Sequence, residues 1–70
     1  MKTGDRIAWK YASGIAHGVV IEIHEEPTQI VSKGKWIRRN GTAKNPALII
    51  EHKSGNDVLK LMSEVQVMKQ

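Results

Sequence analysis

The stretch that decides the fold is SKGKWIRRNGTAKNPALIIE, residues 32–51. Its first half is basic and carries one aromatic ring, Trp36. Asn40-Gly41 follows and is the strongest tight-turn signal in the chain, because both residue types tolerate positive φ. Pro46 then precedes the most apolar run, 47–50. This order predicts a contact surface, a tight turn in which Asn40 or Gly41 has positive φ, and a strand from Ala47 to His52 that is buried on both faces.

Two strands are predicted before this stretch. Asp5 to Tyr11 alternates apolar and polar residues, the pattern of a half-buried strand. Its phase places Trp9 in the core and Tyr11 half buried at one end. Ile15 to His24 is rich in β-branched residues, which strands favour. Within it, Gly18 indicates a bulge or bend, and one face is expected to carry Val19, Ile21 and Ile23.

A third strand is expected from Thr28 to Val31. Lys33-Gly34-Lys35 bends or interrupts it, and residues 36–38 resume it. Adjacent side chains of a strand point to opposite faces. We therefore expect Ile37 to face the core, and Trp36 and Arg38 to share the outer face.

The C-terminal segment allows two structures. Apolar residues from Val58 to Met68 lie near helical spacing, with Asn56 as the N-cap of a terminal amphipathic helix. The alternative is a strand from Val58 to Leu61, one turn at Ser63-Glu64 and a last strand from Val65 to Met68. The pattern leaves both open.

Composition bounds the class of protein. Seventy residues form one domain, residues 1–70. The chain contains no cysteine, which excludes disulfides and thiolate metal sites. The N-terminus lacks the apolar segment of a signal peptide, and no apolar run reaches the ~20 residues that span a bilayer. We expect a cytoplasmic protein without a membrane segment.

The motifs of catalysis are missing from the sequence. His17, His24 and His52 lack the spacing of a metal site, and we expect solvated or hydrogen-bonded rings. No serine has a base beside it in a known motif, and no phosphate-binding loop occurs. The expectation is a protein that is not an enzyme, with no metal and no cofactor.

The remaining candidate site is the basic cluster, which consists of Lys33, Lys35, Trp36, Arg38, Arg39 and Lys44. Lysine and arginine contact phosphates and a ring stacks on a base, a combination typical of single-stranded nucleic-acid binding. The alternative is a strand edge kept soluble by charge, because lysine on an edge strand opposes aggregation. The sequence leaves both interpretations open.

Several short pieces, in order, resemble the Tudor-like domain family of hypervirulence-associated proteins. They are Gly4–Trp9, Gly18–Val20, Ser32–Lys35, Arg38–Thr42, Asn45–Ala47, Ile49 with Glu51, Gly55–Lys60 and Ser63–Val65. The resemblance spans nearly the whole chain. It implies an all-β fold, a small five-stranded Tudor or Src-homology-3-like barrel, and it selects strand, turn, strand for the C-terminus.

The resemblance also implies a binding module, since Tudor-like barrels mostly bind ligands, many through an aromatic cage for methylated lysine or arginine. The aromatic candidates are Trp9, Tyr11 and Trp36, and Trp36 is the best exposed of the three. Three hypotheses follow for the partner: RNA or DNA on the basic hairpin, a peptide or modified side chain of a protein, and nucleotide phosphate on the same patch. We expect a monomer.

Overall fold

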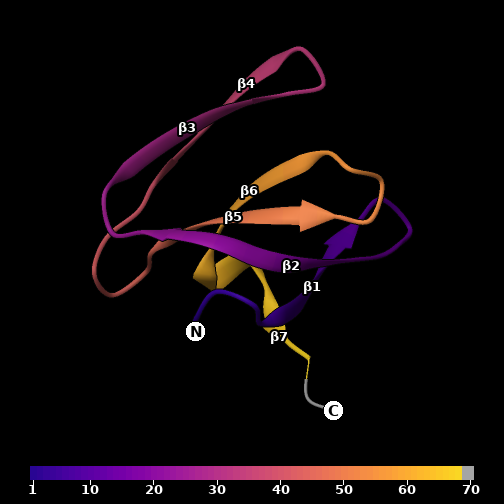
Figure 1. The fold of residues 1–70 in the computed structure, drawn as a ribbon, viewed down its shortest axis with the longest axis horizontal. Coiled ribbons are helices and arrows are strands. Elements are labelled where there is room, and N and C mark those ends of the chain that lie inside the picture. Colours follow the sequence, from indigo (N-terminus) through magenta and orange to yellow (C-terminus); the bar gives the residue numbers. More distant parts are fainter. Residues whose placement is uncertain (69–70) are drawn as a thin grey trace.

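The computed structural model describes residues 1–68 as strands joined by short turns (Figure 1). In order, the elements of this range are β1 (Arg6–Tyr11), β2 (Gly14–His24), β3 (Pro27–Ser32), β4 (Lys35–Asn40), β5 (Ala47–His52), β6 (Asp57–Leu61), the 3-10 turn η1 (Met62–Glu64) and β7 (Gln66–Val67). The all-β class predicted from the sequence is confirmed.

The strands pair antiparallel in two groups. Five of them form a sheet in the order β6-β5-β2-β1-β7, and β3 and β4 form a separate hairpin. Figure 1 shows the hairpin as a second layer beyond β5 and β6, away from β1 and β7. The hairpin is therefore an addition to the five-stranded sheet.

The sheet is buried on both faces at β5, because each face has its own apolar cluster. One cluster consists of Ile7, Trp9, Val20, Leu48 and Ile50. The other consists of Ala47, Ile49 and Leu59, and the partly buried Ile30, Ile37 and Leu61 pack against it. The expectations of a two-sided central strand and of a buried Trp9 are both confirmed.

The tight turn of the hairpin lies at Lys33-Gly34. These residues have φ of 53° and 77° and connect the paired residues Ser32 and Lys35. A two-residue loop with positive φ at both positions suits the right-handed twist of a hairpin. The prediction of positive φ at Asn40-Gly41 is wrong, because neither residue has positive φ. The interruption expected at residues 33–35 is instead a full chain reversal.

Glycine is needed at position 41 for a different reason, because other backbone segments approach it closely. A Cβ atom there would lie 2.6 Å from the carbonyl oxygen of His24, 2.7 Å from the nitrogen of Ala47 and 2.8 Å from the carbonyl oxygen of Glu26. Three backbone segments thus converge at the base of the hairpin. Only glycine leaves room for them.

The bulge in β2 lies between Val20 and Glu22, and the bulge predicted at Gly18 is wrong. Gly18 is regularly paired, and a Cβ there would collide with Ile50. The bulge changes the phase of the strand. As a result Val20 is buried and Ile21 is 39% exposed, so the face expected to carry Val19, Ile21 and Ile23 is not formed as predicted.

The C-terminus of the described range adopts strand, turn, strand. β6 is followed by the single 3-10 turn η1 and by β7, which pairs with β1. The helical alternative is therefore excluded for residues 58–68. None of the helical structure in residues 1–68 has the length and apolar character that crossing a membrane requires.

Candidate functional site

Strand alternation divides the predicted basic cluster between the two faces of the β3–β4 hairpin. On β4, Ile37 and Arg39 are partly buried, whereas Trp36 and Arg38 are exposed. The expectation that Ile37 faces the core while Trp36 and Arg38 share the outer face is confirmed. Lys35 has the same phase as Ile37 and belongs to the inner face.

The outer face presents an aromatic ring to solvent. Trp36 is 72% exposed, and its cross-strand neighbour Val31 is 54% exposed. Arg38 lies two positions along the same strand face, opposite Gln29. Trp36 belongs to neither core cluster. The fold therefore does not use this ring for packing.

The inner face of the hairpin is fastened to the sheet. Ile30 and Ile37 are a cross-strand pair that covers the second core cluster. Near the tip, the hydroxyl of Ser32 donates a hydrogen bond of 2.7 Å to the carbonyl of Asp57 in β6. These contacts fix which face of the hairpin stays exposed.

Arg39 is held by an ion pair. Its Nε donates to Oε1 of Glu64 at 2.8 Å, and the same oxygen accepts from the backbone N–H of Leu61 at 2.8 Å. Partial burial raises the pKa of Glu64, but the hydrogen bonds from Arg39 and Leu61 and the charges of Arg39 and Lys60 outweigh it. The net effect is a pKa below its ordinary value of 4.5. Arg39 is thus already engaged within the fold.

Lys44 lies apart from the other predicted residues. It is exposed in the segment between β4 and β5, at the base of the hairpin, whereas Lys33 lies at the tip. A six-residue strand separates the two ends by about 17 Å. The structure brings Lys33 and Lys35 together and leaves Lys44 outside that group.

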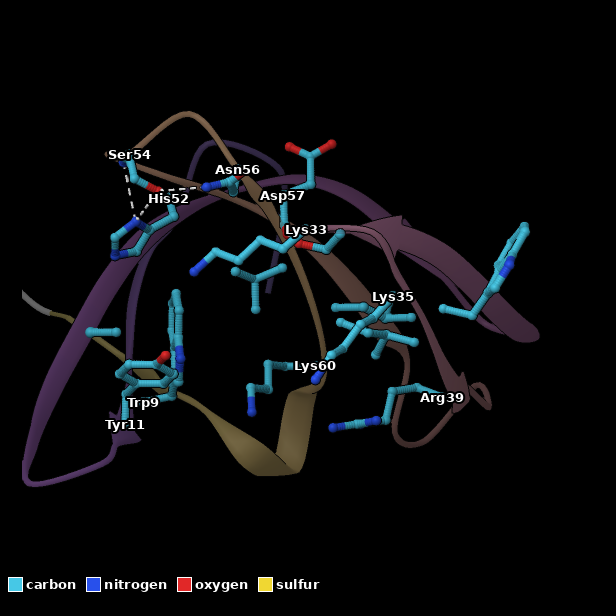
Figure 2. A pocket seen from close by; sticks show the side chains of 16 residues that line it. Trp9, Tyr11, Lys33, Lys35, Arg39, His52, Ser54, Asn56, Asp57 and Lys60 are labelled. Atoms are coloured by element: carbon cyan, nitrogen blue, oxygen red, sulfur yellow. Dashed lines mark hydrogen bonds between the residues drawn. The ribbon is translucent and has the colours of Figure 1, made fainter.

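A cleft of about 430 Å³ runs between the hairpin and the sheet (Figure 2). On the hairpin side it is lined by Lys33, Lys35, Trp36, Ile37 and Arg39, and on the sheet side by residues that include Trp9, Tyr11, Ala16, His52, Val58 and Lys60. Figure 2 shows the labelled lysines extending over the cleft and the rings of Trp9 and Tyr11 together on its opposite side. The cleft combines positive charge with aromatic surface.

The sequence did not predict the sheet side of this cleft. Tyr11 is 64% exposed, so the expectation of a half-buried ring at this position is wrong. His52 stands edge-on to Trp9, with ring centroids 6.2 Å apart and planes at 62°. Lys60 could have been considered from the sequence, since it is a cation on a predicted strand. Only the packing of the hairpin places it opposite Lys35.

The imidazole of His52 has a defined orientation. The backbone N–H of Ser54 donates to Nδ1 at 3.1 Å, and the hydroxyl of Ser54 lies 2.8 Å from the same nitrogen (Figure 2). Because Nδ1 accepts from Ser54, the proton of the neutral ring is on Nε2. Within residues 1–68, no group of three histidine, cysteine or carboxylate side chains is placed as a metal site requires. The side chains that line the cleft offer hydrogen-bond donors and positive charge for binding a ligand.

Comparison with known proteins identifies the family. Residues 4–65 match the family described as "Hypervirulence associated proteins TUDOR domain". No curated protein and no solved structure matches the chain. Tudor-like domains are generally binding modules rather than enzymes, so the match indicates a small binding module. The match covers most of the chain and confirms the resemblance carried by the short sequence pieces: the chain belongs to the Tudor-domain family of hypervirulence-associated proteins.

Proposed function

We propose that this binding module takes single-stranded nucleic acid on the outer face and tip of the β3–β4 hairpin. In this proposal a base stacks on Trp36, and Arg38, Lys33 and Lys35 hold phosphates. The observation that carries it is an aromatic ring that is 72% exposed beside a cation on the same strand face. Ring and guanidinium lie two residues apart, about 7 Å along the strand.

The charge of the hairpin supports this assignment. Residues 27–40 contain four basic residues and no acidic one. Of the four, Arg39 is paired with Glu64 and is less available to a phosphate. The proposed site is therefore narrower than the basic cluster of the sequence, since it also omits Lys44 at the base.

The test is a titration of labelled single-stranded RNA and DNA at two salt concentrations. We expect Trp36→Ala to weaken binding by about 5- to 150-fold, because stacking on an aromatic contributes about 1–3 kcal/mol per base. The salt slope should stay unchanged, since the ring releases no counterion. Arg38→Ala should instead flatten the slope by about 0.7.

Lys44→Ala is the matched control for charge. It removes one exposed cation from the base of the hairpin and is expected to leave the salt slope nearly unchanged. Equal effects of Arg38→Ala and Lys44→Ala would mean that net charge alone drives association. Absence of binding by the folded parent near physiological salt would end the proposal and favour the solubility interpretation.

The same experiment tests the nucleotide-phosphate hypothesis and the oligomeric state. A mononucleotide added as competitor tests the nucleotide-phosphate hypothesis, because one nucleotide can stack on Trp36 but cannot reach several cations. The proposal also takes the chain to be a cytoplasmic monomer. Light scattering at the titration concentration checks the monomeric state.

A further inference from the structure

The β3–β4 hairpin has two strand edges, because within residues 1–68 its strands pair only with each other. The two-residue turn closes on Ser32 and Lys35, which form a hydrogen-bonded pair. Hydrogen-bonded pairs alternate with non-hydrogen-bonded pairs along an antiparallel ladder. Gln29 and Val31 therefore direct their backbone N–H and C=O groups away from β4, toward the free edge of β3.

This edge of β3 is open to solvent. Gln29 is exposed, and Val31 is 54% exposed. Neither residue takes part in a backbone hydrogen bond with a turn or loop in the range 1–68. An incoming strand would meet two donors and two acceptors at strand spacing, without displacing a contact that the fold already makes.

Other strand edges in the described part of the chain are less suited to pairing. On β6, Leu59 belongs to the core cluster that Ile30 and Ile37 cover, and β7 has only two residues. β4 carries three cations, and the carbonyl of Arg38 already accepts from Nη1 of Arg39 at 3.0 Å. Charge on an edge strand opposes pairing with another strand. β3 has the sequence PTQIVS, which contains no charged residue.

The two ends of β3 have opposite charge. Glu25 and Glu26 precede the strand at the base of the hairpin, and Lys33 follows it at the tip; all three are exposed. When two copies of β3 run antiparallel, the tip of each hairpin lies beside the base of the other. The cation of one copy then faces the carboxylates of the other, and symmetry repeats this contact. A parallel arrangement would instead place like charges together.

We propose that a second copy of this chain pairs with β3, antiparallel and about a two-fold axis, so that two hairpins form one four-stranded sheet. Gln29 of each copy lies opposite Val31 of the other, and each such pair exchanges two hydrogen bonds. In this register Pro27, which has no N–H, lies opposite the turn residue Lys33 and falls outside the ladder. The same surface is used by both copies, so the contact closes at two chains.

The pairing joins the outer faces of the two hairpins. Trp36 and Val31 are cross-strand neighbours on this face, so both copies present their rings on one side, about 16 Å apart. A nucleic-acid surface with two rings would follow, and this consequence rests on the proposed function, whereas the pairing does not. One strand per copy buries less than the roughly 1,000 Å² of a stable complex. The dimer is therefore reversible, and the chain is monomeric at the low concentration of the binding titration.

The test uses the full chain without nucleic acid, from micromolar to millimolar concentration. Sedimentation equilibrium measures the mass, and NMR of the ¹⁵N-labelled chain locates the contact. We expect the mass to rise toward that of two chains and the amides of Gln29 and Val31 to shift with concentration. A mass that stays at one chain up to millimolar concentration would overturn the proposal and leave the edge to a strand of another protein. A dimer whose shifts fall on other strands would also overturn it.

Charge exchange tests the antiparallel orientation. Lys33→Glu should weaken self-association about tenfold, because like charges then meet twice, although the lower net charge by itself favours association. Adding Glu26→Lys to this variant should restore the parent behaviour. Lys10→Glu makes the same charge change on β1 of the five-stranded sheet and should cause no loss. Failure of the double variant to restore association, with dispersed spectra showing that it is folded, would overturn the proposal. An equal loss in Lys10→Glu would overturn it as well.

Discussion

The two faces of the β3–β4 hairpin carry similar apolar content but have different surroundings. Ile30 and Ile37 on the inner face pack against the sheet, whereas Val31 and Trp36 on the outer face are 54% and 72% exposed. Each pair consists of one residue of β3 and its cross-strand neighbour in β4. Hydrophobicity of the residues therefore does not decide which face is buried. The presence of a covering element does, and the uncovered face is the one available for contact.

The largest expected effect lies where the hairpin joins the sheet. Gly41→Ala places a Cβ within 2.8 Å of three backbone atoms that cannot move as side chains do. We expect a loss of about 3 kcal/mol in the free energy of unfolding, the upper range for overpacking. The urea midpoint measures it.

The control for this substitution is Gly34→Ala at the tip. Gly34 has φ of 77° and no heavy atom within 4 Å of its Cβ position. Only backbone strain applies there, about 1 kcal/mol. A larger loss at Gly34 than at Gly41 would contradict the close-approach explanation.

A smaller effect is expected from the inner face. Ile37→Ala removes a partly buried side chain from the second core cluster. We expect a loss of about 2 kcal/mol, the low end for truncating buried aliphatic residues. Thermal and urea unfolding both measure it. A loss near zero would mean that the hairpin is not fastened by this contact.

The ion pair of Arg39 and Glu64 predicts a pH dependence. The pKa of Glu64 is lower in the folded chain than its ordinary value of 4.5. Its stabilising contribution is therefore present above about pH 4.5 and is lost as the pH falls through the folded pKa. Both side chains are about one-third exposed, so the contribution stays within about 1 kcal/mol.

Comparison of the parent with Glu64→Gln measures that contribution. The difference in unfolding free energy should be present at pH 7 and should shrink below pH 4.5. A difference that grows on acidification would contradict the sign.

The smallest effect on stability is expected at the outer face. Trp36→Ala should change the free energy of unfolding by no more than about 0.5 kcal/mol, because exposed positions tolerate substitution. Equal unfolding midpoints with impaired nucleic-acid binding would separate contact from folding. A loss as large as that of Ile37→Ala would show that the outer face is not free and would remove the contrast between the two faces.

The family match agrees with the expectation that came from short sequence pieces. Each piece is weak alone, but their order along residues 4–65 is specific. The alternation around Ile37 also predicted the face of Trp36 correctly. The structure divides the six-residue basic cluster, because alternation on β4 places its members on two faces and Arg39 is paired with Glu64.

Local pattern by itself determined the strands before residue 53, the two-sided burial of residues 47–50 and the outward direction of Trp36, because alternation depends only on neighbours along the chain. The family resemblance was needed to choose strand over helix at the C-terminus. Tertiary structure decided the rest. The tight turn lies at Lys33-Gly34, where both residues have positive φ, whereas Gly41 is required by the close approach of three backbone segments. Trp9, Lys35 and Lys60 share a cleft only because the hairpin folds over β6, and contacts between such distant segments leave no periodic trace in the sequence.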